Sequence, residues 1–273
     1  MTDAPLLPLQ QHPHFAAALT VMGRQVRFLD LPGAAPVLAV KQFGQLLTSR
    51  GPVWTEGHGP DAQTLRQSRL RVLNAESADD TALRQAGYRM ITTPAHVAEL
   101  DLTGTPHNRI DRAGGKWRNI WRRAQETGIA LQWQAFDPAQ HAWLFAADRA
   151  QQRQKRFRAL PHALISAYAL QNPRDALVLI ALEDDTAIAA MLFLLHAPGA
   201  TYHLGWSNTR GRRLGAHHQM IMMAAQSLAT RGCTRLDLGS IDTETAPGLA
   251  RFKIGTGAQV RALGGTWLRV PGL

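Results

Sequence analysis

The sequence predicts an α/β protein, in which strands and helices alternate along the chain. Apolar residues alternate with polar ones in short segments and recur at helical spacing in longer ones, and the two kinds of segment follow each other along the chain. Hydrophobic residues make up 45% of the chain and charged residues 18%, which is a globular composition. The 273 residues are enough for one large domain or two small ones, each with its own core.

Short strands and short helices are expected in the first part of the chain. The first fifteen residues contain three prolines and predict an irregular arm. Helices are expected at residues 61–67 and 79–85. Strands are expected at residues 25–31, 36–43, 51–54, 70–73 and 88–93.

The clearest single element is a helix expected from Arg112 to Thr127, after which Gly128 supplies a C-terminal stop. Its apolar residues recur at positions i, i+3, i+4 and i+7, which is the pattern of one buried helix face. The other faces carry basic side chains. The apolar residues are Trp117, Ile120, Trp121 and Ala124.

From residue 129 onward, strands and helices alternate more regularly. A turn at 183–186 joins two strands into a hairpin, and a loop rich in glycine and arginine at 208–211 precedes the last long helix. Helices are expected from Asp137-Pro138 to about residue 157, at 161–170 and at 213–229. Strands are expected at 129–136, 176–182, 187–196, 201–206 and 234–239, followed by two short strands that end at residue 270.

The chain carries a net charge of +10, and 26 of its 30 basic residues are arginine. Such a charge predicts an anionic partner, either nucleic acid, a phosphorylated small molecule or a membrane surface. A bias toward arginine is also what a GC-rich genome produces. The charge alone therefore leaves the partner open.

The sequence favours a soluble, cytoplasmic protein without a stable membrane association. Its longest apolar run, residues 187–195, is far shorter than a membrane span. The start of the chain lacks the basic and apolar regions of a signal peptide. The single cysteine, Cys233, excludes an internal disulfide, and we expect it to be buried and inert. His217 and His218 diverge on a helix and have no cysteine partner, so we expect no metal site.

Three segments resemble motifs of one known family. Residues 116–124 resemble a basic helix, K-x-R-x-x-x-R-x-A, near the end of the first Fem-like domain. Residues 248–257 resemble the segment G-L-x-x-F-K-x-x-F-G near the end of the second, and residues 212–217 partly match the donor-loop pattern R/Q-x-x-G-x-G/A. Together with the order of elements, these segments make the chain similar to the Fem-type branch of the GNAT superfamily of N-acyltransferases, the relatives of peptidoglycan bridge-forming aminoacyltransferases.

This resemblance implies an α/β fold of two tandem GNAT-like domains, with mixed central sheets flanked by helices. Residues 1–130 would form the N-terminal domain, without a complete donor site, and residues 131–273 the catalytic domain. The implied enzyme is an N-acyltransferase that moves an acyl group from acyl-CoA, such as acetyl-CoA, to the primary amine of a small molecule or peptide. No Ser–His or Cys–His arrangement for a covalent intermediate is evident in the sequence, which agrees with direct attack by the amine.

Two other functions remain open at the level of the sequence. The nearer one is a Fem-like aminoacyltransferase that takes its acyl group from aminoacyl-tRNA, which the positive charge would suit. The other is a non-enzymatic protein that binds RNA or a nucleotide-linked ligand on the same scaffold.

The resemblance implies that an acyl-CoA donor binds at the loop before the last long helix. Backbone N–H groups at a helix N-terminus bind anions, and guanidinium groups pair with pyrophosphate. The alternative interpretation is a solvated basic turn that caps a core helix. The residues expected to bind the coenzyme are Arg210, Arg212, Arg213, Gly215 and Ala216.

Two residues near the end of the chain are candidates for the chemistry. Lys253 lies in the second motif, where the resemblance implies a lysine that steadies charge during transfer, since a fixed ammonium stabilises a developing oxyanion. Asp242 is the preferred general base, which would remove a proton from the amine. For each carboxylate in this region the competing interpretation is a solvent-facing side chain; the other two are Asp237 and Glu244.

The strand at 201–206 and the basic helix supply the remaining candidates. Tyr202 is a candidate acid for the leaving thiolate, and it shares its strand with His203, so that one of the two is expected to face the site. The basic helix, with a second basic run at 149–158, would hold the phosphates of a large acceptor or of RNA, although solvated helix faces explain both runs equally simply. The residues expected to bind the substrate are Lys116, Arg118, Arg122 and Phe252.

Overall fold

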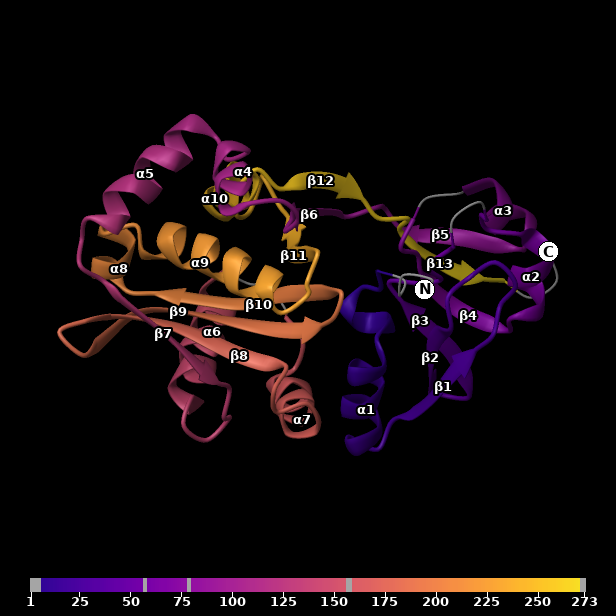
Figure 1. Cartoon of the computed structure of the whole chain (residues 1–273). Coiled ribbons are helices and arrows are strands. Elements are labelled where there is room, and N and C mark those ends of the chain that lie inside the picture. Colours follow the sequence, from indigo (N-terminus) through magenta and orange to yellow (C-terminus); the bar gives the residue numbers. More distant parts are fainter. Residues whose placement is uncertain (1–5, 56–57, 78–79, 156–158, 271–273) are drawn as a thin grey trace. The chain divides into compact units, whose positions relative to one another are not determined.

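The computed structural model describes residues 6–55, 58–77, 80–155 and 159–270, and Figure 1 shows its elements. The chain forms two compact units, Met1–Val97 with Arg261–Leu273, and Ala98–Val260. Each unit is built on a β-sheet with helices packed against it. The predicted α/β fold with two mixed sheets flanked by helices is therefore confirmed.

The units divide at residues 97/98, whereas the sequence places the division at residue 130. The difference arises because the basic helix α5 (Gly115–Gln125) packs on α9 (Ala216–Thr230) and so belongs to the second unit. At the other end, β13 (Thr266–Arg269) pairs with two strands of the first unit. The chain thus returns to the first unit after it has completed the second.

The sheet of the first unit has six strands in the order β1-β2-β3-β4-β13-β5. Strands β3 and β4 are parallel, and all other neighbours are antiparallel. Trp267 of β13 is fully buried in the core of this unit. The strands are β1 (Gln25–Leu29), β2 (Val37–Gln42), β3 (Gln45–Ser49), β4 (Leu70–Asn74) and β5 (Tyr88–Thr92), and the helices are η1 (Leu9–Gln11), α1 (Pro13–Val21), α2 (Ala62–Gln67) and α3 (Asp80–Gln85).

Two predictions for the first unit are wrong. The expected irregular arm contains η1 and the start of α1. Helix α1 begins there because a proline at the first helical position is compatible with the helix and His12 caps the first turn with its side chain. Residues 51–54 do not form the expected strand. Trp54 makes only a single bridge with Ala34, and the strand lies earlier, at β3.

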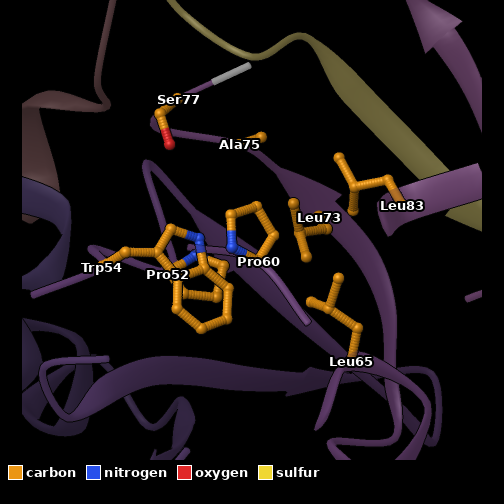
Figure 2. Close-up of a pocket in the computed structure, with 8 residues that line it drawn as sticks. All are labelled: Pro52, Trp54, Pro60, Leu65, Leu73, Ala75, Ser77 and Leu83. Carbon is orange, nitrogen blue, oxygen red and sulfur yellow. The ribbon is translucent and has the colours of Figure 1, made fainter. Parts of the chain in front are cut away.

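Figure 2 shows a pocket inside the first unit, lined almost entirely by apolar side chains. Its volume of about 10 Å³ is close to the smallest that holds one water molecule. An acyl donor or acceptor does not fit there, so this pocket is a small packing gap. Its lining residues are Pro52, Trp54, Pro60, Leu65, Leu73, Ala75, Ser77 and Leu83.

The sheet of the second unit has seven strands in the order β12-β6-β11-β10-β9-β8-β7. The predicted hairpin is confirmed, and the two residues of its turn, Asp184 and Asp185, both have positive φ. The strands are β6 (His96–Asp101), β7 (Ala130–Ala135), β8 (Ala176–Glu183), β9 (Thr186–His196), β10 (Gly199–Ser207), β11 (Arg235–Ile241) and β12 (Gln259–Ala262).

Helices cover both faces of this sheet. Helix α9 lies against one face, and α6 (Ala142–Lys155) and α7 (His162–Gln171) lie against the other (Figure 1). Helix α5 packs on the outer side of α9 and also contacts α10 (Pro247–Gly255). The remaining helices are α4 (Pro106–Asp111) and α8 (Thr209–Arg213).

Helix boundaries in this unit differ from the expected ones at two places. Asp137 does not cap α6; its Oδ1 accepts the N–H of Ala139 (2.7 Å) and closes a separate turn, so the helix begins at Ala142. The expected loop at 208–211 is the start of helix α8, because the side chain of Asn208 accepts the N–H of Gly211 (2.8 Å) and caps it.

Strands β10 and β11 run in parallel and then separate. They are paired only from Gly199 to Thr201 of β10, whereas β10 stays paired with β9 as far as Ser207. The register with β9 shifts between Tyr202 and Leu204, which places a bulge at His203. Beyond Thr201, the edge of β10 toward β11 therefore has no strand partner among the described residues.

Among the helices of the described segments, none combines the length and the apolar composition that crossing a bilayer requires.

Candidate functional site

The candidate site is built around the separated ends of β10 and β11. Helix α10 follows β11 and brings Lys253 back to the end of that strand, where the Lys253 Nζ donates a hydrogen bond to the carbonyl of Ser240 (2.8 Å). Nearby, Gly239 has a φ of +80°, which favours glycine, and a Cβ there would make an ordinary contact with that Nζ at 3.6 Å. The strand end and the helix thus fix one ammonium group in place.

Lys253 is a buried lysine, with only 6% of the residue exposed. Burial lowers the pKa of Lys253 to about 8, and the nearby carboxylate of Asp237 opposes that shift. Asp237 is itself buried and accepts the N–H of Gly239 (2.7 Å). At neutral pH the site therefore holds a positive charge that is largely shielded from water.

Tyr202 lies on the α9 face of β10, in the core of the second unit, with its ring centre 5.8 Å from that of Phe193. Its hydroxyl lies so close to Gly205 that a Cβ there would be 1.8 Å from the oxygen. Burial raises the pKa of Tyr202 above its usual range, so the hydroxyl stays protonated. The neighbouring His203 interacts electrostatically instead with Asp148 on α6 and with His162 on α7.

Asp242 is exposed, and its carboxylate is hydrogen-bonded within its own loop. Its Oδ1 accepts the N–H groups of Glu244 (2.9 Å) and Thr245 (2.8 Å), and its Oδ2 accepts the hydroxyl of Thr245. These hydrogen bonds hold the pKa of Asp242 below its usual value. The carboxylate closes the loop after β11 and is poorly suited to accept a proton.

The arginines expected to bind the donor have different surroundings. Arg210 forms a two-pronged ion pair with Glu183, with distances of 2.8 and 2.6 Å. Arg212 donates to the carbonyl of Ser207 (2.5 Å). Arg213 is exposed, and within the described segments its guanidinium has no hydrogen bond or ion pair. Two of the three guanidinium groups are thus partly engaged within the protein.

Gly215 and Ala216, expected at the phosphate site, are both buried. Gly215 has a φ of +70° and precedes α9; a Cβ there would come within 3.0 Å of the Ile120 side chain and 3.4 Å of Ala124. Helix α5 therefore covers the first residues of α9. The side of this helix end that faces α5 is thus closed to a phosphate.

The basic face of α5 is exposed. Lys116 is exposed, Arg118 pairs with Asp111 (3.5 Å), and Arg122 donates to the side chain of Asn119 (3.1 Å). Contacts of this kind are weak and typical of a solvated helix face.

Phe252 belongs to a cluster of rings that positions α10. The Trp117 Nε1 donates to the carbonyl of Phe252 (3.1 Å), and the ring of His218 lies 4.8 Å from that of Trp117 and 5.3 Å from that of Phe252. Burial lowers the pKa of His218 to about 4, so it is a neutral core histidine. This cluster fixes α10 against α5 and α9 and so positions Lys253, the next residue.

Sequence reasoning missed Asp148 and His162. Asp148 follows Leu144 by one helical turn and therefore lies on the buried side of α6, where it is only 7% exposed. A carboxylate in the apolar stripe of a helix was the available signal. The basic residues at 149–158 obscure this signal, because they predict a solvated helix face in the same segment.

Neither a metal nor a cysteine nucleophile is supported by the described residues. Within them, no group of three or more histidine, cysteine, aspartate or glutamate side chains is arranged to hold a metal ion. Cys233 is buried, and burial raises its pKa to about 11, so its thiol is protonated.

Comparison with known proteins identifies one family. The family described as "Acetyltransferase (GNAT) domain" matches residues 115–253, slightly more than half of the chain. The match begins at the first residue of α5 and ends at Lys253. No curated protein sequence matches.

Solved structures that are similar in fold include the following three. The structure of FemX has a TM-score of 0.74 at 12% identity, over 98% of this chain and 93% of that chain. The C-terminal domain (DUF2156) of a putative lysylphosphatidylglycerol synthetase from Agrobacterium fabrum has a TM-score of 0.59 at 15% identity, over 96% and 89%. L-PGS from Bacillus licheniformis has a TM-score of 0.55 at 16% identity, over 98% and 94%. At these identities the likeness is one of fold alone.

Proposed function

Because the chain belongs to the family of acetyltransferase (GNAT) domains and is an acyltransferase, we propose that it moves an acyl group from acyl-CoA to a primary amine by direct attack of that amine. The predicted resemblance to Fem-type tandem GNAT proteins is confirmed by the family match and by the likeness to FemX over almost the whole chain. The donor, the acceptor and the roles of single residues are the proposal.

The observation that carries the proposal is the buried ammonium of Lys253 at the separated ends of β10 and β11. When an amine attacks a thioester, the carbonyl oxygen becomes an oxyanion, and the C–S bond then breaks. A fixed positive charge in an enclosed site stabilises that oxyanion far better than an exposed one. We assign this role to Lys253.

Tyr202 is proposed as the acid that protonates the departing thiolate. Its hydroxyl remains protonated, and among the described side chains and backbone groups it has no hydrogen-bond partner. The proton that the attacking amine loses passes to solvent water rather than to Asp242, whose carboxylate is engaged in the loop.

The coenzyme phosphates are assigned to guanidinium groups rather than to the backbone of Gly215 and Ala216. Arg213 is exposed and open to a ligand, and Arg212 is its neighbour at the end of α8. Guanidinium groups bind phosphate oxygens in pairs of hydrogen bonds.

A second donor, aminoacyl-tRNA, is favoured by the cover that α5 places over the start of α9. If phosphates do not reach that helix end, the exposed basic face of α5, with Lys116, Arg118 and Arg122, is the alternative anion-binding surface. The acyl transfer itself, with Lys253 and Tyr202, would be the same.

Thermal unfolding with each donor tests the proposal. At 100 times its dissociation constant, a ligand stabilises a protein by about 2.7 kcal/mol. We expect acetyl-CoA to produce a saturable rise in Tm that is lost in the double variant Arg212→Ala/Arg213→Ala. The matched control, Arg118→Ala/Arg122→Ala on α5, keeps that rise. Stabilisation by aminoacyl-tRNA alone, lost in the α5 variant, identifies the second donor, and no response to either contradicts the proposal.

A further inference from the structure

Phe43 is an unusual residue for its position, the tip of the turn that joins β2 to β3 in the first unit. Gln42 pairs with Gln45, so the turn has two central residues, Phe43 and Gly44, and both have positive φ, +48° and +75°. Such a turn favours asparagine or aspartate before the glycine, whereas a bulky side chain there is strained. Phe43 is also 93% exposed. A strained, exposed aromatic residue that contributes nothing to the core indicates a function.

Three basic side chains lie at the same end of the sheet. By the register of β1 and β2, Arg27 and Lys41 point to one face of the sheet, and Arg24 directly precedes β1. All three are exposed, and their charged groups have no hydrogen bond or ion pair with the residues that the structure describes. Residues 21–29 and 41–50 contain no aspartate or glutamate. This end of the sheet therefore carries three positive charges without a counter-charge in its own segments.

An open depression joins these features into one surface, the basic–aromatic tip, which consists of Arg24, Arg27, Lys41 and Phe43. The depression has a volume of about 450 Å³ and is lined by residues 23–25, before and at the start of β1, and by residues 41–44, at the β2–β3 turn. That volume is in the range of small-ligand sites. The end of α1 adds Val21, which is 51% exposed and leads directly into this segment (Figure 1).

The charges and the projecting ring together favour one kind of partner. An anionic lipid bilayer presents phosphates at its surface and an apolar layer beneath them, and it binds proteins that offer basic side chains beside an exposed apolar one. A second copy of this chain would bring three positive charges against three others, which is unfavourable. A nucleic acid binds cations that follow its backbone over several phosphates, whereas these three gather at one turn.

We propose that the basic–aromatic tip binds reversibly to an anionic lipid surface, with Phe43 inserted among the headgroups and the three basic side chains bound to lipid phosphates. Each cation near such a surface strengthens binding about fivefold, and a partly buried ring adds at least a similar factor. The result is weak, reversible binding, unlike the stable association that the sequence argues against. It does not depend on the proposed acyl transfer, because the tip belongs to the first unit and Lys253 to the second.

Sedimentation of the full chain with lipid vesicles tests the proposal. The probes are vesicles of phosphatidylcholine alone and of an equal mixture of phosphatidylcholine and phosphatidylglycerol, at low and at high salt. We expect binding to the mixed vesicles that weakens as the salt concentration rises, because salt screens exposed charges, and little binding to phosphatidylcholine alone. Equal binding to both kinds of vesicle, or binding to neither, overturns the proposal.

Phe43→Asn separates lipid binding from folding. Asparagine before glycine is the favoured pair in this turn, so we expect a Tm equal to or higher than that of the native protein. Vesicle binding should nevertheless be at least about fivefold weaker, and Phe43→Trp should retain it. The matched control is Leu170→Gln on α7, at a residue that is 71% exposed, and it leaves vesicle binding unchanged. Unchanged binding in Phe43→Asn overturns the proposal.

The double variant Arg24→Gln/Lys41→Gln tests the cations. We expect it to bind the mixed vesicles about 25-fold more weakly than the native protein. The control Arg174→Gln/Arg231→Gln removes the same charge from exposed positions of the second unit and leaves the binding unchanged. Equal losses in the two double variants would mean that only the net charge matters, and they would overturn the assignment to the tip.

Two further measurements test the other partners. Single-stranded RNA that binds the native protein and not Phe43→Asn, in the absence of vesicle binding, assigns the tip to nucleic acid and overturns the proposal. Self-association in sedimentation velocity that Phe43→Asn abolishes, again without vesicle binding, assigns the tip to a second copy of the chain and overturns it equally.

Discussion

Burial decides the charge of the titratable side chains around the separated strands, and Lys253 is the clearest case. Its pKa of about 8 is below the value of 10.5 for a free lysine, so its charge is present at neutral pH and is lost as the pH rises past 8. We expect the transfer rate to fall above about pH 8. A profile between pH 6.5 and 9.5 measures this. In Lys253→Arg, which keeps its charge, the remaining activity does not show that fall.

The same burial makes Lys253 unfavourable for stability. The unfolded chain binds the lysine proton more tightly than the folded one, so the free energy of unfolding rises with pH between about 8 and 10.5, and below pH 8 the penalty is fully present. Lys253→Met removes it. We expect a Tm at pH 7 that is equal to or higher than that of the native protein, and a transfer rate reduced by about 10² to 10³.

A clear fall in Tm for Lys253→Met at pH 7 would mean that the hydrogen bond to Ser240 outweighs the unfavourable burial of the charge. Ser240→Ala is the control for this experiment, because the bond is made to the backbone carbonyl, which that substitution keeps.

Packing between two helices explains the glycine before α9. Gly215 and Gly232 both have positive φ, +70° and +84°. A Cβ at Gly215 would lie 3.0 Å from the side chain of Ile120 on α5, whereas a Cβ at Gly232 would have no neighbour within 4 Å. We expect Gly232→Ala to destabilise the protein by about 1 kcal/mol and Gly215→Ala by about 1–3 kcal/mol more. Chemical denaturation of both variants measures the difference.

The additional Ile120→Ala substitution should remove most of the extra effect of Gly215→Ala, because it removes the side chain that the new methyl group meets. If the two glycine variants are equally destabilised, α5 does not press on the start of α9 in solution. The donor phosphates would then have access to that helix end after all.

At the scale of the whole molecule, Trp267 connects the last described strand to the core of the first unit. It is fully buried, and its Nε1 donates to the carbonyl of Gly264 (2.8 Å). We expect Trp267→Ala to destabilise the first unit by about 3–5 kcal/mol. Hydrogen exchange should show faster exchange in β4 and β5 and unchanged protection in β8 and β9. The control is Trp143→Ala, at a partly exposed tryptophan of the second unit. Equal loss of protection in both units of the Trp267→Ala variant would contradict the division of the chain.

The elements that the sequence predicts well are those whose pattern is local. The apolar spacing around Trp117 and the buried runs of β8 and β9 reflect a single helix face and two central strands, so their periodicity is sufficient. The return of β13 to the first sheet depends on pairing between segments far apart in sequence, which no local pattern encodes. The same is true of the division of the chain into units.

The sequence predicts the candidate site only in part, because only some of its residues lie in a local pattern. Lys253 lies in a specific motif, and its burial agrees with the role that the resemblance implies. Asp242 is a candidate base only because of its position in the loop after a strand. Its hydrogen bonds to Thr245, which the sequence does not reveal, make its carboxylate a poor proton acceptor. Asp148 gives a signal only once the buried side of α6 is known.

The position of β13 has a consequence for the order in which the protein folds during synthesis. The ribosome releases the chain from its N-terminus, and domains that are continuous in sequence fold as they emerge. Here β13 lies between β4 and β5, so the first unit lacks an interior strand until every residue of the second unit has been made. The second unit is continuous in sequence and is able to form first. Strands β4 and β5 thus lack their shared partner on the nascent chain until the second unit has been made, and a stop codon before residue 266 leaves them without it.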